Sequence, residues 1–271
     1  MQLGRRSHHA DINCKPEKSN CLNKISPKIV TCGSDHTLII DYNGNAYIWG
    51  ANDQGQLGIS HSRRSPHIVS MTKIGKNIKH CASKGITSYI VNGDGQILKW
   101  PNPNMLEKFV PLAVPIKEYG IKFSYVTCGQ DFAIGLTDNG LLYGYGENSY
   151  GQLGLSDEKP RQHFIKNHTL WGEFAERVSN VSCGYGHVIA KCFSGKVYTW
   201  GLNSHCQLGD HTKVNSSTPK VVQIVDYKKC AFKARSVQAG YESTFILTED
   251  RTVYVSGSNP QILKNNEIFE K

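Results

Sequence analysis

Short apolar runs alternate with polar turns along the chain. Leu38-Ile39-Ile40 and Ala46-Tyr47-Ile48-Trp49 are rich in β-branched and aromatic residues, and Asn43-Gly44 lies between them. An Asn-Gly dipeptide provides positive φ at low cost, so this stretch predicts a β-hairpin. The dipeptides at the matching places in later stretches are Asn139-Gly140, Ser194-Gly195 and Glu249-Asp250. We therefore expect an all-β chain built from repeated hairpins.

Two short phrases frame each hairpin. A Val-x-Cys-Gly phrase or its variant ends at Gly33, Gly129, Gly184 and Gly240, and an aromatic-Gly phrase ends at Gly50, Gly146, Gly201 and Gly257. The two glycines are 17 residues apart in all four copies. A separation that is held without insertion marks a copied structural unit. One small sheet cannot bury both of its faces, so the units are expected to stack on one another.

Five units are visible, and the second is degenerate. They cover about residues 29–58, 78–101, 125–154, 180–209 and 236–259. In the second unit, Cys81-Ala-Ser-Lys84 replaces the Cys-Gly phrase and Trp100-Pro101 replaces Trp-Gly, with an alignment that is ambiguous by two residues. Since proline cannot donate to a β-ladder, Pro101 predicts a strand that ends early or lies at an edge.

The repeated unit resembles the regulator of chromosome condensation repeat. His36-Thr37, Trp49-Gly50, His187 and Trp200-Gly201 fit the pattern of that family, and so does the recurring Asn-x-x-Gly-Gln-Leu-Gly phrase. The resemblance covers nearly the whole chain. It implies a β-propeller, usually of seven blades in this family, and we expect residues 1–271 to form a single propeller domain.

The two ends of the sequence leave two readings of the ring open. Met1-Gln-Leu-Gly4 matches the end of a repeat, and the fifth unit stops after Asn259 without a Gly-Gln-Leu-Gly phrase. In one reading the chain is a fragment of a longer propeller and forms an incomplete ring. In the other, residues 1–28 complete the fifth unit and close a ring of five blades, a number that propellers allow.

Positive charge is concentrated in a few segments. The formal net charge is +9, and residues 61–84 contribute +6 through Arg63, Arg64, Lys73, Lys76, Lys79 and Lys84 without any acidic residue. Residues 1–28, which include Arg5 and Arg6, contribute +4. Because both segments follow the end of a repeat, we expect them to form one basic surface that docks an acidic protein tail, a nucleosome or a nucleic acid. The alternative is a set of solvated loops.

No constellation of catalytic, cofactor-binding or metal-binding residues emerges, and none is expected. The sequence has no G-x-S-x-G motif, no phosphate-binding loop and no C-x-x-C pair. His36 and His187 recur in phase, which favours a hydrogen bond inside each blade. Trp49, Tyr145 and Trp200 are expected to pack between blades, and the repeat glycines to supply positive φ or close backbone approach.

The cysteines point to a reducing compartment. Cys32, Cys128 and Cys183 occupy one repeat position, where a small buried apolar side chain is expected. Free buried thiols are typical of intracellular proteins, which favours the cytoplasm, with the nucleus as the alternative. The N-terminus has no apolar signal-peptide core, and no run of 18 apolar residues exists.

The sequence therefore predicts a non-catalytic scaffold for protein–protein interaction without a cofactor. One alternative is a guanine-nucleotide exchange factor for a Ran-type small GTPase, the activity of the founding family member. The other is a regulatory propeller within a larger kinase or ubiquitin ligase.

Overall fold

The computed structural model spans residues 1–271 and forms two compact units, Met1–Val126 and Thr127–Lys271. The structure describes residues 22, 25–52, 54–57, 69–100, 114–115, 120–168, 176–222 and 233–258. Within these ranges the regular secondary structure is β, and no helix is long and apolar enough to cross a membrane. The single domain expected from the sequence stays a prediction.

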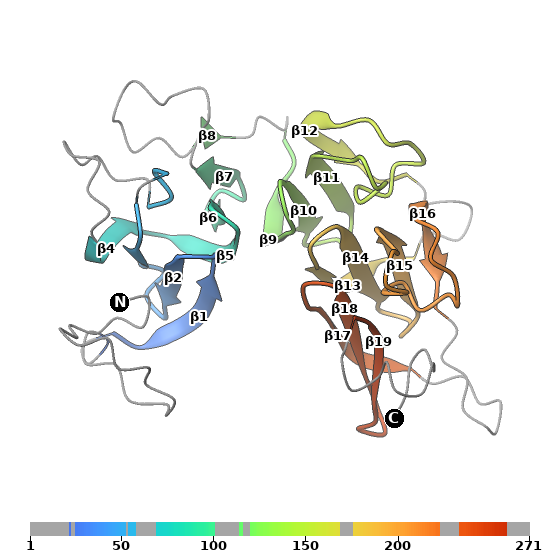
Figure 1. Cartoon of the computed structure of the whole chain (residues 1–271). Helices are drawn as coiled ribbons and strands as arrows, with labels where there is room; N and C mark the ends of the chain where they lie inside the picture. Colours follow the sequence, from blue (N-terminus) through green and yellow to red (C-terminus); the bar gives the residue numbers. More distant parts are fainter. Residues whose placement is uncertain are drawn as a thin grey trace, which may run out of the picture. The chain divides into compact units, whose positions relative to one another are not determined.

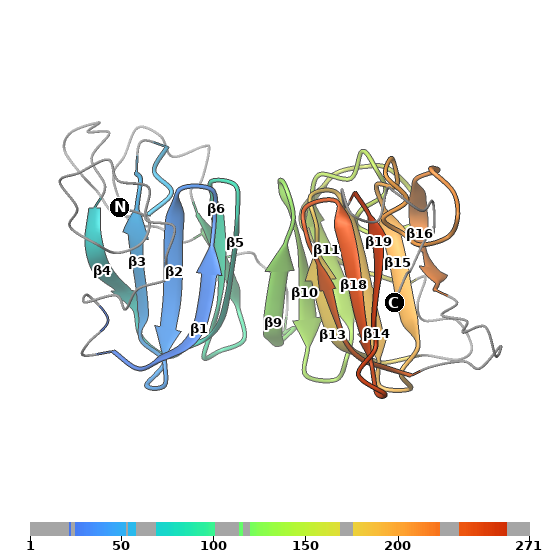
Figure 2. The ribbon, with the colours of Figure 1, turned by 60° about the horizontal axis from the view of Figure 1, so that its bottom comes forward.

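The first unit contains two four-stranded antiparallel sheets, which we call blades 1 and 2 (Figure 1). Blade 1 consists of β1 (Pro27–Cys32), β2 (His36–Asp41), β3 (Ala46–Gly50) and β4 (Val69–Gly75). Blade 2 consists of β5 (Ile78–Lys84), β6 (Thr87–Asn92), β7 (Ile97–Trp100) and β8 (Val114–Pro115). In both blades the strands lie side by side in chain order, as Figure 2 shows for β1 to β4.

The second unit contains three sheets with the same strand order, blades 3, 4 and 5. Blade 3 consists of β9 (Phe123–Cys128, which begins at the end of the first unit), β10 (Phe132–Thr137), β11 (Leu142–Gly146) and β12 (Arg161–Lys166). Blade 4 consists of β13 (Val178–Cys183), β14 (His187–Cys192), β15 (Val197–Gly201) and β16 (Ser216–Val221). Blade 5 has three described strands, β17 (Ala234–Ala239), β18 (Ser243–Thr248) and β19 (Val253–Gly257).

Strand register resolves the alignment of the degenerate second repeat. Ser83 pairs with Ser88 in blade 2 as Cys32 pairs with Thr37 in blade 1. Lys84 therefore occupies the place of the repeat glycine. The strand β7 has four described residues where β3, β11, β15 and β19 have five, and Pro101, from which an early end is predicted, lies outside the described residues.

Positive φ at the hairpin turns explains most of the turn glycines. Gly44, Gly140 and Gly195 have φ of 74°, 79° and 89°. In blade 5 the residue with positive φ is Arg251, at 70°, so the turn dipeptide is Asp250-Arg251. The sequence prediction of Glu249-Asp250 was wrong by one residue, because the blade 5 turn has no glycine to mark its position.

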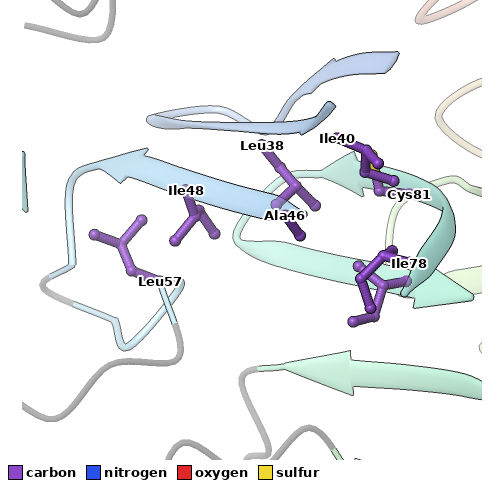
Figure 3. Packing of buried hydrophobic residues seen from close by; sticks show 8 residues of the cluster. Leu38, Ile40, Ala46, Ile48, Leu57, Ile78 and Cys81 are labelled. Atoms are coloured by element: carbon purple, nitrogen blue, oxygen red, sulfur yellow. The ribbon is translucent and has the colours of Figure 1, made fainter. Parts of the chain in front are cut away.

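Each core lies between neighbouring blades. In the first unit, residues of β2, β3 and the bend after β3 pack with residues of β5 and β6 (Figure 3), namely Leu38, Ile40, Ala46, Ile48, Leu57, Ile78, Cys81 and Ile90. In the second unit, Ile189, Val197 and Val222 of blade 4 pack with Ala234, Val237, Ala239, Ile246 and Tyr254 of blade 5. The first strand of blade 2 thus packs against the first two strands of blade 1, and the first strand of blade 5 against the first two strands of blade 4. We call this contact a seam.

Candidate interaction surfaces and the seams between blades

The recurring histidines bridge two blades. The Nε2 atom of His36 lies 2.7 Å from Oγ of Ser88 in blade 2, and Nε2 of His187 lies 3.0 Å from Oγ1 of Thr244 in blade 5. Both imidazoles are buried. The sequence prediction of a bond inside each blade was wrong, because the histidine starts the second strand, where its ring reaches the sheet of the following blade.

An aromatic ring lies directly over the repeat glycine. A Cβ atom at Gly33 would overlap the imidazole of His36 and would lie 2.6 Å from the carbonyl oxygen of Gly85 in the next blade. At Gly184 it would overlap His187 and lie 2.8 Å from the carbonyl oxygen of Gly240. This glycine is therefore required by close approach across the seam, and not by its backbone dihedral angles.

Blade 3 reproduces the same arrangement with a different ring. The side chain at the histidine position is Phe132, and a Cβ atom at Gly129 would overlap it. In blade 5 the ring is replaced by Ser243, and the nearest atom to a Cβ on Gly240 is 3.6 Å away. The glycine is thus needed only where an aromatic ring covers it.

A side-chain hydroxyl accepts a backbone hydrogen bond between three pairs of neighbouring blades. The N–H of Cys183 donates to Oγ1 of Thr127 (3.2 Å), and the N–H of Ala239 donates to Oγ of Ser182 (3.0 Å). In the first unit, the N–H of Ser83 donates to Oγ1 of Thr31 (3.0 Å). The residue between Val and Cys in the repeat phrase is therefore Thr or Ser because it joins successive blades.

The repeat cysteines are not all buried. Cys128 and Cys183 are each 5% exposed and face a seam, as expected. Cys32 is exposed, so the prediction of a buried thiol was wrong at this position. It lies on β1, which packs with β2 and β5 within the first unit.

The repeat aromatics divide into two roles. Trp200 is fully buried, and its Nε1–H donates to the carbonyl oxygen of Gln152 in the preceding blade at 2.9 Å, which confirms packing between blades. Tyr145 contacts Phe164 of its own blade, with ring centroids 5.4 Å apart. The strand β12 brings this aromatic side chain beside Tyr145, and packing of Tyr145 between blades stays a prediction.

Buried amides close the bend after the third strand. Oδ1 of Asn148 accepts the N–H of Leu153 at 2.8 Å, and Oε1 of Gln152 accepts the N–H of Tyr150 at 2.8 Å. Asn52 and Asn203 make the equivalent bonds to Leu57 and Leu208. Sequence reasoning assigned no role to these residues, although their fixed spacing in three copies was the signal for one.

Burial keeps the side chains of His36, His80 and Cys192 uncharged near neutral pH. Desolvation lowers the pKa of both His36 and His80 to about 4, so both imidazoles are neutral at pH 7. Burial, followed by the nearby Glu176 carboxylate, raises the pKa of the Cys192 thiol to about 12. No group of three or more His, Cys, Asp or Glu side chains able to hold a metal ion occurs in the part of the chain that the structure describes.

The exposed turns between the first and second strands share a backbone and differ in side chain. The N–H of Gln130 donates to the carbonyl oxygen of Tyr185 at 2.9 Å, and the N–H of Tyr185 donates to that of Tyr241 at 2.7 Å. The two tyrosine rings lie 4.8 Å apart, and Tyr241 is 59% exposed. In blade 1 the same position is Ser34, whose N–H donates to Gly85 at 2.8 Å.

The repeated residues that form these blades also match models of a known protein family. Two family models described as the regulator of chromosome condensation (RCC1) repeat match the chain, one over residues 139–190 and 194–247 and the other over residues 28–56, 123–152 and 178–207. The chain belongs to the RCC1 repeat family. Its fold is all-β and of the RCC1 propeller type.

Among curated relatives, the Ultraviolet-B receptor UVR8 of Arabidopsis thaliana is 30% identical over 259 residues, which cover 91% of this chain and 57% of the receptor. Human E3 ubiquitin-protein ligase HERC2 is 24% identical over 247 residues, which cover 83% of this chain and 5% of the ligase. The crystal structure of Prp20p from Saccharomyces cerevisiae matches with a TM-score of 0.67 and 21% identity over 85% of this chain and 57% of Prp20p. The chain therefore spans little more than half of the length of UVR8.

The described lysines of the predicted basic surface lie in two places on the RCC1 scaffold. Lys73 at the end of β4, Lys76 in the connection and Lys79 at the start of β5 are exposed within seven residues of one another. Lys84 is half-buried at the other end of β5, about 16 Å along the strand from Lys79. The remaining predicted residues, Arg5, Arg6, Arg63 and Arg64, lie outside the described residues.

Proposed function

We propose that this RCC1-repeat chain is a non-catalytic scaffold for protein–protein interaction. The observation that carries the proposal is that recurring side chains and varying side chains have different places in the fold. Side chains that recur, such as those of His187, Thr127 and Trp200, make hydrogen bonds between neighbouring blades. Those that vary, such as Ser34, Gln130 and Tyr185, stand on turns of constant backbone. A rigid array that presents different side chains at equivalent places is suited to recognition by its loops.

The partner that we propose is an acidic protein, and its docking surface is the group formed by Lys73, Lys76 and Lys79. All three ammonium groups are on exposed side chains around a single connection between blades. Lys73 lies with Nζ 5.9 Å from the ring centroid of Tyr47, a cation–π contact that leaves the charge at the surface. Such charges raise the rate of encounter with an acidic partner more than they prolong the complex. Chromatin and nucleic acid are alternative partners, because they also carry negative charge.

The test compares partner capture by two charge-reversed proteins of equal net charge. One carries Lys73→Glu, Lys76→Glu and Lys79→Glu. The control carries Lys122→Glu, Lys159→Glu and Lys213→Glu, which change three exposed lysines elsewhere. We expect wild type and control to retain the same acidic protein and the first variant to lose it. Equal recovery by all three proteins would overturn the basic docking surface.

Membership of a larger assembly is the second candidate, and one observation favours it. The chain matches 5% of human HERC2, a ubiquitin ligase, so a propeller of this kind occurs there as one part of a much longer protein. Prp20p is itself characterised by its binding properties to Gsp1p and histones. At 21% identity this likeness supports the fold, and nucleotide exchange therefore ranks below scaffolding. For location, the buried thiols of Cys128 and Cys183 favour an intracellular scaffold.

A further inference from the structure

An exposed aromatic ring stands beside the basic docking surface of the first unit. Tyr42 is 73% exposed in the turn that joins β2 to β3. The carbonyl oxygen of Gly44, in the same turn, accepts the N–H of Ile78 at 2.9 Å. Lys76 and Lys79 lie on either side of Ile78 in the chain, and both are exposed. This backbone contact therefore fixes the turn of Tyr42 against the connection that carries the two lysines.

Lysines also lie on the other side and at the base of this turn. The N–H of Tyr42 donates to the carbonyl oxygen of Ser26 at 3.2 Å, and Lys28 follows two residues later with an exposed side chain. The register of β3 and β4 pairs Lys73 with Tyr47, five residues after Tyr42. The described cations around the turn are therefore four exposed lysines, Lys28, Lys73, Lys76 and Lys79.

The acidic residue of the turn faces inward. Asp41 is 6% exposed. Its Oδ1 atom accepts the N–H groups of Asn43 at 2.9 Å and Asn45 at 2.8 Å, and its Oδ2 atom accepts the side-chain amide of Asn45 at 2.7 Å. The carboxylate is thus used to hold the turn, and the outer surface of the turn presents an aromatic ring among ammonium groups.

The exposure of this turn position does not depend on which blades lie beside it. Strand register places Phe193 of blade 4 at the position of Tyr42. Phe193 is 71% exposed, although blades 3 and 5 both contact blade 4. The two turns differ in charge, because Lys196 beside Phe193 forms an ion pair with Glu176 at 2.5 Å.

We propose that Tyr42 is the apolar anchor of the basic docking surface, and that the partner presents one aromatic side chain within an extended acidic segment. This inference rests on the proposed function and names the element that the partner must carry. Tyrosine is enriched among the residues that contribute most to binding at interfaces. Two aromatic rings attract each other beyond the area that they bury, and the surrounding lysines attract the flanking carboxylates.

A single ring favours a peptide over single-stranded nucleic acid. Among the side chains that the structure describes in the first unit, Tyr42 is the only exposed aromatic one. Proteins that hold single strands stack successive bases on several rings. The four described cations are lysines, which act as point charges and lack the bidentate geometry with which arginine binds phosphate. One ring with point charges around it matches one aromatic residue between acidic ones.

The experiment measures the affinity of the full chain for two short peptides of equal charge. Both consist of aspartate and glutamate, one with a central phenylalanine and the other with a central serine. Wild type should bind the phenylalanine peptide about three- to tenfold more tightly. Tyr42→Ser should bind both peptides as wild type binds the serine peptide, and Tyr42→Phe should restore the preference. Tyr241→Ser, at a tyrosine that is 59% exposed in a turn without lysine or arginine, is the matched control and should behave as wild type.

The outcomes separate this inference from the proposed function. Equal affinity of wild type for the two peptides would overturn the role of Tyr42 and leave the basic docking surface standing, and so would a preference that persists in Tyr42→Ser. Failure of wild type to bind either peptide would overturn both. A single-stranded oligothymidylate that binds through Tyr42, while neither peptide does, would assign the surface to nucleic acid instead. Melting temperatures equal to that of wild type establish that each variant is folded.

Discussion

The hydroxyl of Thr244 accepts a hydrogen bond from Nε2–H of His187, 57 residues earlier in the chain. The direction follows from the second bond of this hydroxyl, which donates to the carbonyl oxygen of Gln207 at 2.7 Å. Its single proton is used there, so His187 must carry its own proton on Nε2. Blade 4 therefore holds blade 5 through a chain of buried hydrogen bonds that runs from Nε2–H of His187 to the hydroxyl of Thr244 and on to the carbonyl oxygen of Gln207.

The first prediction compares two glycines at one repeat position. Gly184→Ala should lower the free energy of unfolding by about 2 kcal/mol or more, because the new methyl group overlaps His187 and the backbone of Gly240. Gly240→Ala should leave it unchanged or raise it by about 0.5 kcal/mol, because no atom lies within 3.5 Å and the unfolded chain loses entropy. Urea denaturation of the two variants makes the comparison. Equal losses would show that the ring over the glycine is not what requires it.

The second prediction concerns the glycine after the aromatic. Gly146 has φ of 100°, and a Cβ atom there would overlap the carbonyl of Asp131 and lie 2.9 Å from Cα of Phe132. Gly146→Val should therefore cost about 3 kcal/mol or more.

Gly120→Ala separates dihedral strain from overlap in that test. Gly120 also has positive φ, at 71°, but no atom lies within 4 Å of its Cβ position, so the change should cost about 1 kcal/mol. Thermal unfolding checks both variants. An unchanged melting temperature for Gly146→Val would contradict the account of these glycines.

The third prediction is that the free energy of unfolding decreases as the pH falls, and that His36 is a cause of this decrease. Burial lowers its pKa to about 4 although the Asp35 carboxylate opposes the shift, so the folded state keeps the ring neutral. Between pH 6.5 and about 4 the unfolded chain binds the proton and the folded chain does not. The stabilisation is therefore complete above pH 6.5 and is lost as the pH falls to about 4, by about 3 kcal/mol in total.

His36→Gln is the control, because His80 titrates in the same range and remains present. The glutamine amide can still donate to Ser88 but does not titrate. Wild type should lose more unfolding free energy between pH 7 and pH 4 than this variant does. Parallel losses in the two proteins would mean that His36 takes up its proton without opposing the fold.

The hairpins of the blades could be predicted from the sequence, but the hydrogen bonds between blades could not. Hairpins and their repeat length follow from local signals such as Asn43-Gly44 and the regular glycines. The bonds from His36 to Ser88 and from Thr31 to Ser83 join residues 52 positions apart, and no local pattern encodes such a partner. The repeat shows that the residue type at such a position is fixed. It does not show whether the hydrogen-bond partner lies in the same blade or in the next one.

The remaining errors concern three single positions, Cys32, Arg251 and Lys84. Cys32 and Cys128 stand in the same Val-Thr-Cys-Gly phrase, yet only Cys128 is buried, so the phrase alone does not fix the burial of its cysteine. Arg251 holds a positive φ where the other turns use glycine, so the dipeptide rule placed that turn one residue early. Lys84 was counted with the basic residues around Lys76, and strand register shows that it replaces a repeat glycine.

The fourth prediction is a negative result in an exchange assay. Because the proposed function is scaffolding, the purified protein should not accelerate release of a labelled guanine nucleotide from a Ran-type GTPase above the spontaneous rate. A chelator of magnesium serves as the positive control for release. Catalysed release would place exchange ahead of scaffolding as the function.

The most direct measurement of the central claim is the affinity of the captured partner for wild type and for the Lys73→Glu, Lys76→Glu, Lys79→Glu variant at low and at physiological salt. The account predicts that wild-type affinity falls as salt rises, because the Debye length shortens to about 8 Å at physiological ionic strength. The variant should bind much more weakly at low salt, chiefly through a slower association rate, with the melting temperature of wild type. Equal affinities, or affinities indifferent to salt, would contradict the claim that these lysines dock an acidic partner.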